Sequence, residues 1–282
     1  MPDTSTSATT NEDHFSDVDD INVLVVKLRE SLQQSHPEID NFFSDNYLKS
    51  VLSVPNRAYE YSRDIKILGA LNWRRSYCVD ALVKTFECVC DTDGVPIFRL
   101  AVTSVMDRVA NDNNESSSSL VFLPSQYLIE VCQSGAFYFA GFDGKGRAIL
   151  HARTALLDWW KTGVEDGIRY HVLVIEHALS EISKRRSRRS ELKEVRTMDT
   201  ISESMVLNVD TSNMRLLPPP PLGSIIGMAQ LLQIAYPDRI HQIRVGPVNS
   251  LLMKFYEYVK PYLRPRSRDK IVLLDHAPNV NL

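Results

Sequence analysis

The sequence lacks any apolar stretch that is long enough to cross a lipid bilayer. Its longest apolar runs, such as residues 120–123 (Leu-Val-Phe-Leu), fall far short of the roughly 20 residues that a membrane-spanning helix needs. Residues 1–20 also lack lysine, arginine and an apolar core, which argues against a secretory signal there. Because this segment carries six acidic residues, we expect a disordered acidic tail. These absences favour a soluble, cytoplasmic protein.

Cysteine is scarce, and the chain carries little net charge. The 282 residues include four cysteines, Cys78, Cys88, Cys90 and Cys132, which indicates reduced thiols in a reducing compartment. Cys88 and Cys90 are too close for the usual zinc-binding spacing, and no second pair complements them, so we expect them to pack as apolar side chains. The net charge of −3 argues against a nucleic-acid partner.

Enzymatic and metal-binding motifs are also missing. The sequence has no glycine-lysine-serine phosphate loop, no histidine-glutamate metal helix and no glycine-x-serine-x-glycine elbow. Residues 143–146 (Asp-Gly-Lys-Gly) predict a hairpin turn rather than a nucleotide loop, because no helix follows them. His171 and His177 are six residues apart, which places them on different faces of a helix. We therefore expect a non-enzymatic protein without a metal or cofactor.

The spacing of apolar residues divides the chain into a helical part and an α/β part. Residues 21–135 carry apolar residues at helical spacing, including a stripe over residues 79–89 that residues 91–94 (Asp-Thr-Asp-Gly) end. Residues 111–119 are polar and serine-rich, which predicts a loop or a disordered insertion. We therefore expect a helical N-terminal domain over residues 21–135 and an α/β lobe over residues 136–282.

In the α/β part, strand-like segments alternate with helices. Residues 137–142 and 148–153 predict a hairpin, and residues 205–210 predict a further strand. The long helix after the hairpin has an apolar stripe, made of Ile168, Val172, Ile175, Leu179 and Ile182. A basic insertion follows near residues 184–200. We expect a solvated helix end there, with a nuclear signal or a docking site for anionic lipid as alternatives.

The C-terminal residues combine an apolar helix with a basic turn. Residues 236–239 (Tyr-Pro-Asp-Arg) precede a strand around residues 243–245, and a helix then runs to residues 260–263 (Lys-Pro-Tyr-Leu). The broad apolar face of this helix consists of Leu251, Leu252, Phe255, Val259 and Tyr262. The basic turn over residues 264–270 then leads into a strand over residues 271–274. A basic turn beside an apolar lobe suits an amphiphile with an anionic head.

These segments resemble the CRAL-TRIO family, the phosphatidylinositol-transfer type of lipid-binding domain. Residues 236–274 are similar to the family pattern of tyrosine-proline-acid-arginine, a strand, lysine-proline-aromatic-leucine, and a hydroxyl residue three positions before the lysine that opens the last strand. Residues 137–147 resemble the family's aromatic hairpin, and residues 71–82 resemble a basic pair on its N-terminal helices, with an insertion at Ser76. The resemblance implies a CRAL-TRIO-like lobe of mixed sheet flanked by helices, preceded by an all-helical N-terminal domain.

The resemblance also implies a binding site for an inositol-phosphate headgroup. The residues carried over by position are Asp238, Arg239, Ser267 and Lys270, with Arg74 and Arg75 from the N-terminal helices. Aspartate replaces the commoner glutamate and serine the commoner threonine, but a carboxylate still accepts bonds from inositol hydroxyls, and serine, lysine and arginine still donate to phosphate. The alternative is a solvated turn with a surface Asp-Lys pair.

The family's second site, for the choline head of phosphatidylcholine, is not matched. Phe139 and Leu150 replace its two tyrosines, and Met205 and Leu207 replace its small hydroxyl residues. We expect these four side chains to line an apolar cavity instead. The resemblance then implies an inositol-lipid binder that lacks the choline-lipid mode and takes a different apolar second ligand.

The family has a gating helix and a further strand after the segment that matches residues 270–274, whereas this chain ends eight residues later, at Leu282. We therefore expect a lid supplied differently, an open cavity, or a role in membrane or partner sensing. Trp159 and Trp160 are expected to be half-buried packing residues, with insertion into a membrane interface as the alternative. The leading hypothesis is a peripheral protein that binds and transfers or presents a phospholipid, with phosphatidylinositol or a phosphoinositide favoured and transient membrane contact. The rival is a gate-less lobe that docks a membrane or a protein.

Overall fold

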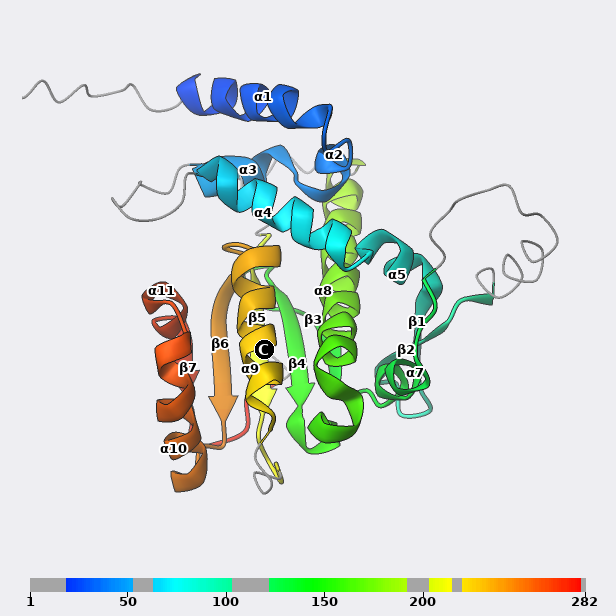
Figure 1. Cartoon of the computed structure of the whole chain (residues 1–282), viewed down its shortest axis with the longest axis vertical. Coiled ribbons are helices and arrows are strands. Elements are labelled where there is room, and N and C mark those ends of the chain that lie inside the picture. The colour runs from blue at the N-terminus through cyan, green and yellow to red at the C-terminus, as the bar shows by residue number, and fades with distance from the viewer. Residues whose placement is uncertain (1–18, 53–62, 103–121, 192–202, 215–219, 280–282) are drawn as a thin grey trace, which may run out of the picture. The chain divides into compact units, whose positions relative to one another are not determined.

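The computed structural model describes five segments of the chain (Figure 1). They are residues 19–52, 63–102, 122–191, 203–214 and 220–279. The chain divides into two compact units, Met1–Ile65 and Lys66–Leu282, so the boundary expected between residues 135 and 136 lies inside the second unit. Residues 1–18 of the expected acidic tail, the serine-rich loop and the end of the basic insertion lie outside the described residues, and the last two residues of that expected tail begin a helix.

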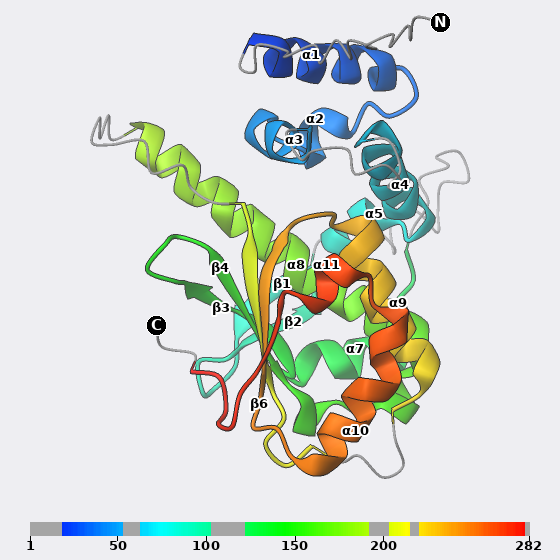
Figure 2. The ribbon, with the colours of Figure 1, turned by 90° about the vertical axis from the view of Figure 1, so that its left-hand side faces the viewer.

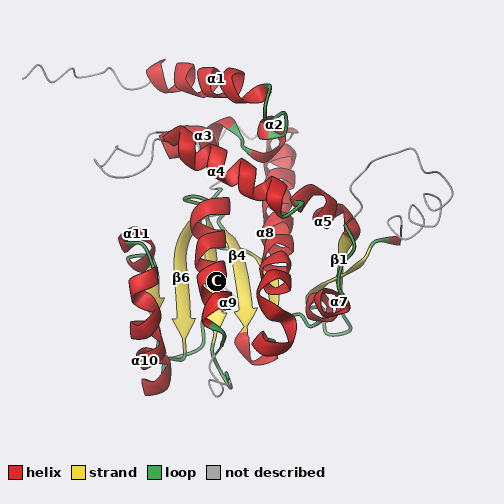
Figure 3. Ribbon diagram, viewed as in Figure 1, coloured by secondary structure: helices red, strands yellow, loops and turns green. Residues whose placement is uncertain are grey.

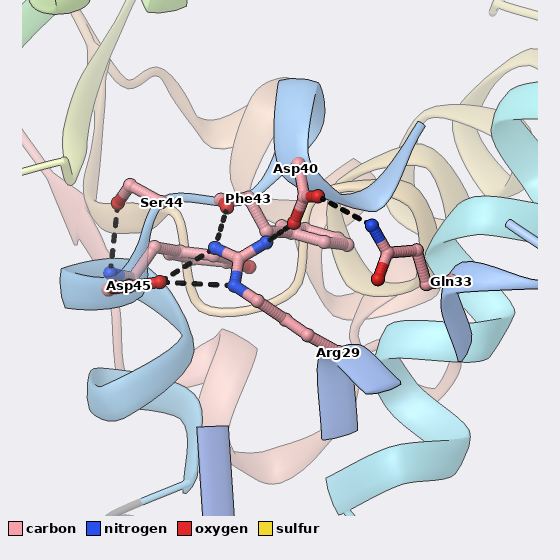
Figure 4. A network of polar contacts seen from close by, with 7 residues as sticks. Arg29, Gln33, Asp40, Phe43, Ser44 and Asp45 are labelled. Carbon is pink, nitrogen blue, oxygen red and sulfur yellow. Dashed lines mark hydrogen bonds and ion pairs between the residues drawn. The ribbon is translucent and has the colours of Figure 1, made fainter. Parts of the chain in front are cut away.

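In the first unit, one arginine connects three helices. These are α1 (Asp19–Gln33), α2 (Ile39–Phe42) and α3 (Asp45–Leu52). The guanidinium of Arg29 on α1 bonds to the Asp40 carboxylate on α2, to the carbonyl oxygen of Phe43 at 2.7 Å and to the Asp45 carboxylate on α3 at 2.8 Å (Figure 4). The buried apolar side chains of this unit include Val25, Leu28, Ile39, Phe43 and Leu48. The predicted helical N-terminal region is thus confirmed.

The second unit is built on a five-stranded mixed sheet. In spatial order its strands are β3 (Phe137–Phe142), β4 (Ala148–Arg153), β5 (Met205–Asp210), β6 (Ile240–Gly246) and β7 (Ile271–Leu273). β3 and β4 form an antiparallel hairpin, and β4 to β7 run parallel to one another. The Asp143 carboxylate closes the hairpin turn by accepting bonds from the backbone N–H groups of Lys145 and Arg147. The predicted hairpin and the predicted strand over residues 205–210 are confirmed.

Helices connect the parallel strands and cover one face of the sheet. α8 (Trp159–Glu191) links β4 to β5, and α9 (Leu222–Gln230) with the π-helical turn η2 (Leu231–Ala235) links β5 to β6. α10 (Ser250–Val259), η3 (Lys260–Tyr262) and α11 (Pro265–Arg268) link β6 to β7. Since the strands follow one another in chain order, right-handed crossovers place these helices on the same face, as Figures 1 and 2 show. The predicted α/β class is confirmed, with yellow strands behind red helices in Figure 3.

The helix predicted over residues 79–89 is wrong beyond Thr85. α4 (Arg63–Ser76) and α5 (Val79–Thr85) are followed by an antiparallel hairpin of β1 (Phe86–Cys90) and β2 (Pro96–Leu100). The Asp91 carboxylate accepts bonds from the backbone N–H groups of Asp93 at 2.9 Å and Val95 at 2.8 Å, so it forms the hairpin turn instead of ending a helix. Apolar residues at positions 82, 86 and 89 fit a helical period, but pairing with residues 96–100 determines the structure after Thr85.

α8 is interrupted close to its start. Gly163 has φ 74° and ψ 174°, a conformation outside the helical range that glycine adopts without a steric penalty. The first turn, which carries Trp159 and Trp160, is therefore separated from the rest of the helix. A bond of 2.5 Å from Lys161 to Glu130 connects this turn to α7 (Gln126–Gln133). Despite its length of 33 residues, α8 is not apolar enough to cross a membrane, and neither is any other helix among the described residues.

Candidate functional site

An apolar cavity of about 270 Å³ lies between the sheet and its covering helices. Leu207 and Ile243 line it from the sheet, and Ile175, Met228 and Phe255 line it from α8, α9 and α10. Most of its other lining side chains are also apolar. A cavity of this composition suits the hydrocarbon part of a ligand rather than a polar molecule.

Two rows of apolar side chains form the floor of the cavity. Residues two apart on a strand point to the same face of a sheet, and paired residues on neighbouring strands share that face. The first row runs across the four parallel strands through Leu150, Leu207, Ile243 and Ile271, which are successive register partners. The second row runs through Ala152, Val209, Val245 and Leu273. The alternation of apolar residues in these strands therefore produces one continuous apolar surface.

The helix between β6 and β7 covers one side of the cavity. Leu252, Phe255 and Val259 of α10, together with Leu263 beyond it, face the cavity, whereas Leu251 on the same helix is 44% exposed. The cap of this helix is well formed, since the Asn249 side chain accepts a bond of 2.8 Å from the N–H of Leu252. α10 and Leu263 therefore cover one side of the cavity.

Two of the four predicted wall residues line the cavity, and two do not. Leu150 and Leu207 belong to the first row of the floor. Phe139 lies on the edge strand β3, where its ring is 5.9 Å from that of His177 on α8, so the helix covers it. Met205 is completely buried at the start of β5, and its N–H donates to the carbonyl oxygen of Arg239 at 2.7 Å. The expectation for Phe139 and Met205 is thus wrong, because Phe139 lies half-buried at the edge of the sheet and Met205 packs into the core beside the cavity.

A cluster of charged side chains lies where β6 and β7 begin. Nζ of Lys270 donates to the carbonyl oxygen of Ile240 at 2.5 Å and is 4.0 Å from the Asp238 carboxylate. Arg266 pairs with the same carboxylate at 3.1 Å. Ile240 and Ile271 are also cavity-lining residues. The structure therefore brings Asp238, Arg266 and Lys270 together at one end of the cavity.

The local backbone and burial shape this cluster. Asp238 has φ 58°, a left-handed conformation that short polar side chains tolerate better than most, which fits aspartate at this position. Burial lowers the pKa of Lys270; the Asp238 carboxylate opposes this shift, and Arg266 adds to it. Ser267 is half-buried in α11, and its N–H donates to the carbonyl oxygen of Arg264 at 2.9 Å. Of the predicted residues, Asp238 and Lys270 are therefore within ion-pair distance, and Ser267 lies on α11, which precedes Lys270.

Arg74, which was also predicted to bind the headgroup, takes part in an internal network. Its guanidinium donates to Glu176 on α8 at 2.7 Å and pairs with Asp80 at 2.5 Å. The hydroxyl of Tyr236 donates to the same Glu176 oxygen at 2.7 Å. Burial raises the pKa of Tyr236, and the neighbouring Glu176 carboxylate raises it further. Glu176 therefore holds both Arg74 of α4 and the segment before Asp238 to α8.

The remaining two predicted arginines, Arg75 and Arg239, differ in burial. Arg75 is exposed. Arg239 is only 3% exposed and pairs with Glu203 at 3.0 Å, and Glu203 also pairs with Arg186. A guanidinium that is buried and paired in this way has little surface left for a headgroup. Arg266 belongs to the cluster but was absent from the predicted residues, although its place three residues before Asp269 in a basic turn was a visible signal.

Comparisons with known proteins agree with this architecture. Residues 132–279 match the CRAL/TRIO domain, a segment that contains the entire five-stranded sheet, the cavity and the Lys270 cluster. The fold is similar to the crystal structure of Sfh5, with a TM-score of 0.52 and 14% sequence identity over 92% of this chain and 82% of that chain. A comparison with curated proteins gives no match. Because the CRAL/TRIO match covers more than half of the sequence, the chain belongs to the CRAL/TRIO domain family.

Proposed function

We propose that this protein binds a phospholipid in the apolar cavity and transfers or presents it to a membrane. Membership of the CRAL/TRIO family supports lipid binding in general. The observation that carries the proposal is the combination of an apolar cavity with a cationic cluster at one end. That combination matches a molecule with hydrocarbon chains and an anionic head. A binding role, rather than a catalytic one, is also what the family supports.

The acyl chains would occupy the space between the strand rows and α10. Each methylene that leaves water contributes about 0.8 kcal/mol, so the cavity competes with a bilayer for the same chains on nearly equal terms. Small differences in headgroup binding then decide whether the lipid is extracted. α10, which covers the cavity between β6 and β7, is the segment that would have to move for the lipid to enter.

The headgroup would be an inositol phosphate. Lys270 is bonded to a neutral carbonyl group, so its positive charge is only partly balanced by Asp238 at 4.0 Å. Arg266 has a side chain that is 47% exposed and can reach an anionic oxygen beside the cluster. The Asp238 carboxylate can accept bonds from inositol hydroxyls, and Ser267 can donate to phosphate. These groups favour phosphatidylinositol or a phosphoinositide as the ligand.

Removal of the Lys270 amine tests this proposal. We expect Lys270→Ala to reduce transfer of phosphatidylinositol between vesicles by about tenfold to a hundredfold, because a charge-assisted hydrogen bond contributes about 1.5–3 kcal/mol. Lys254→Ala is the matched control, since Lys254 is an exposed lysine on α10 outside the cluster. Thermal unfolding of both variants, and mass spectrometry of lipids that co-purify with the wild type, complete the experiment.

The same assay, run with phosphatidylcholine vesicles, tests headgroup selectivity. We expect little phosphatidylcholine transfer, because Leu150 and Leu207, the two predicted wall residues that line the cavity, offer no hydroxyl groups to a choline phosphate. Efficient transfer of phosphatidylcholine, or transfer of phosphatidylinositol that is equal in Lys270→Ala and Lys254→Ala, would contradict the proposed headgroup site.

The rival function, docking through the basic end of α8, has weaker support. Arg186 pairs with Glu203, and the guanidinium of Arg185 lies 4.4 Å from the ring centre of Phe142. Lys184 pairs with Glu181 at 2.6 Å. These contacts compensate part of the positive charge that a docking surface would need. A protein that contains no lipid, but whose vesicle binding depends on Arg185 and Arg188, would favour this rival.

A further inference from the structure

The segment that joins β4 to the main part of α8 covers one end of the cavity. Leu157 and Trp159 of this segment line the cavity, whereas Leu156 and Trp160 are 48% and 59% exposed. The segment follows the last residue of β4, and Lys270 precedes the first residue of β7. Because β4 to β7 run parallel, the segment lies where the strands finish, beside their arrowheads in Figure 1. It therefore covers the end of the cavity that is remote from the Lys270 cluster.

Two anchors bound this segment. On one side, Oγ1 of Thr154 donates to the carbonyl oxygen of Asp210 at 2.8 Å, and Thr154 is only 6% exposed. On the other side, the main part of α8 packs closely against α9. A Cβ atom at Gly227 of α9 would lie only 2.8 Å from Cδ1 of Ile168 on α8, so the two helices are in tight contact there. Residues 155–162, which lie between the anchors, are called the flap below.

The polar contacts of the flap are weak. Among the described residues, its one ion pair is the bond of 2.5 Å from Lys161 to Glu130 of α7, and these side chains are 54% and 43% exposed. The backbone N–H groups of Lys161 and Thr162 donate to Asp158, which belongs to the flap itself. Exposed ion pairs contribute little to stability, and segments with few fixed contacts open most easily. The flap can therefore move while α8 and the sheet keep their places.

Gly163 provides a hinge between the flap and the main part of α8. Its φ of 74° and ψ of 174° lie in a region that is essentially restricted to glycine. Apart from its neighbours along the helix, a Cβ atom at this residue would have no atom of the described residues within 4 Å. A substitution here therefore acts through the backbone conformation and not through a clash with another part of the protein.

We infer that the flap is a hinged cover that opens the cavity at the end where the parallel strands finish, and that hydrocarbon enters and leaves there. The inference rests on the proposed function only in that the cavity holds a hydrocarbon chain. α10 would open the side of the cavity, whereas the flap opens its end. The tail of a lipid can then enter or leave while its head stays at the Lys270 cluster.

Gly163→Ala tests the hinge in the full-length protein, with Gly167→Ala as the matched control. Alanine disfavours the backbone conformation of residue 163 by a factor of about ten, so the closed flap should become less populated. Gly167 is on the same helix without a positive φ, and a Cβ atom there also meets no described atom within 4 Å. Stopped-flow uptake of the fluorescent hydrocarbon diphenylhexatriene should be about tenfold faster in Gly163→Ala and unchanged in Gly167→Ala.

Lys161→Gln tests the ion pair of the flap and leaves the backbone unaltered. We expect uptake to be about twofold to fivefold faster, which is the range that loss of an exposed ion pair allows. Lys184→Gln is the control, because Lys184 pairs with Glu181 at 2.6 Å and is 56% exposed, but lies near the other end of α8. Its uptake rate should equal that of the wild type.

Amide hydrogen exchange measures the same motion without a ligand. We expect the peptide that covers residues 155–162 to exchange faster than one that covers residues 168–178, and faster still in Gly163→Ala. Equal exchange of this peptide in Gly163→Ala and Gly167→Ala would overturn the inference. Faster exchange without faster uptake of the hydrocarbon would also overturn it, since the flap would then move without opening the cavity.

The hydrocarbon has no headgroup, so its uptake separates this inference from the proposed function. If Lys270→Ala loses phosphatidylinositol transfer and Gly163→Ala takes up the hydrocarbon faster, both proposals are supported. If the wild type fails to transfer phosphatidylinositol but Gly163→Ala still accelerates uptake, only the phospholipid proposal fails. If phosphatidylinositol is transferred but Gly163→Ala and Gly167→Ala have equal uptake rates, only the flap inference fails.

Discussion

Replacement of Glu176 by alanine should lower the free energy of unfolding by about 3–5 kcal/mol, the range found when one partner of a buried ion pair is removed. Glu176 accepts hydrogen bonds from Arg74 and from Tyr236, both at 2.7 Å. The side chains of Glu176 and Arg74 are 11% and 13% exposed. The variant would therefore leave a largely buried guanidinium with only the exposed Asp80 carboxylate as its counter-charge, and a buried phenol without its acceptor.

Urea unfolding at neutral pH measures this effect, and Glu165→Ala is its control. Glu165 is on the same helix and pairs with Arg169 at 3.1 Å, but its side chain is 73% exposed. Exposed pairs contribute about 0–1 kcal/mol, so the control should remain close to the wild type. A double variant, Arg74→Met with Glu176→Leu, should recover part of the loss because it removes both charges. Equal stability of Glu176→Ala and Glu165→Ala would show that the network contributes little.

Acidification should lower the free energy of unfolding by about 3 kcal/mol through the protonation of His171. The pKa of His171 is lowered from 6.5 to about 4, because burial disfavours the charged ring. Between pH 6.5 and 4 the unfolded chain binds a proton that the folded chain does not bind, so the stability falls as the pH falls. Each pKa unit corresponds to about 1.4 kcal/mol. The full contribution of His171 to the free energy of unfolding is present above pH 6.5 and is lost once the pH reaches about 4.

His171→Leu isolates this contribution from that of the carboxylates. Unfolding in urea at pH 7 and pH 4.5 should show a pH dependence that is about 2–3 kcal/mol smaller in the variant than in the wild type. His241→Leu serves as the control, since His241 is exposed and its replacement should alter the pH dependence much less. Wild type and His171→Leu with the same pH dependence would mean that His171 is protonated in the folded state near its ordinary pKa.

The sheet and the family could both be predicted from the sequence, because they depend on strong local patterns. Residues 137–142 and 148–153 contain aromatic and branched side chains around a turn with Asp143 and two glycines, and they form β3 and β4. Residues 205–210 form a buried strand for the same reason. The segment from Tyr236 to Lys270 preserves the order of turn, strand, helix and basic turn that the resemblance requires.

Long-range pairing is the part that local patterns do not reveal. Arg74 and Glu176 are 102 residues apart, and nothing in the spacing of either residue indicates their ion pair. The stripe over residues 79–89 fits a helix, yet β1 forms because β2 is available to pair with it. Phe139 and Met205 are apolar residues on strands next to the cavity, but neither lines it. Phe139 is covered by α8, and Met205 is buried at the start of β5.

The strand rows that form the floor of the cavity and the helix α10 that covers it differ in how well they can accommodate a ligand of a different size. Leu207 and Val209 belong to β5, whose backbone is hydrogen-bonded to β4 on one side and β6 on the other, so a bulkier side chain there cannot be relieved by shifting one strand. α10 contacts the cavity through side chains alone, including Leu252 and Val259, and short connectors join it to the sheet. Substitutions on α10 should therefore change the size of the ligand that the cavity accepts, whereas the strand rows form a wall whose position is fixed.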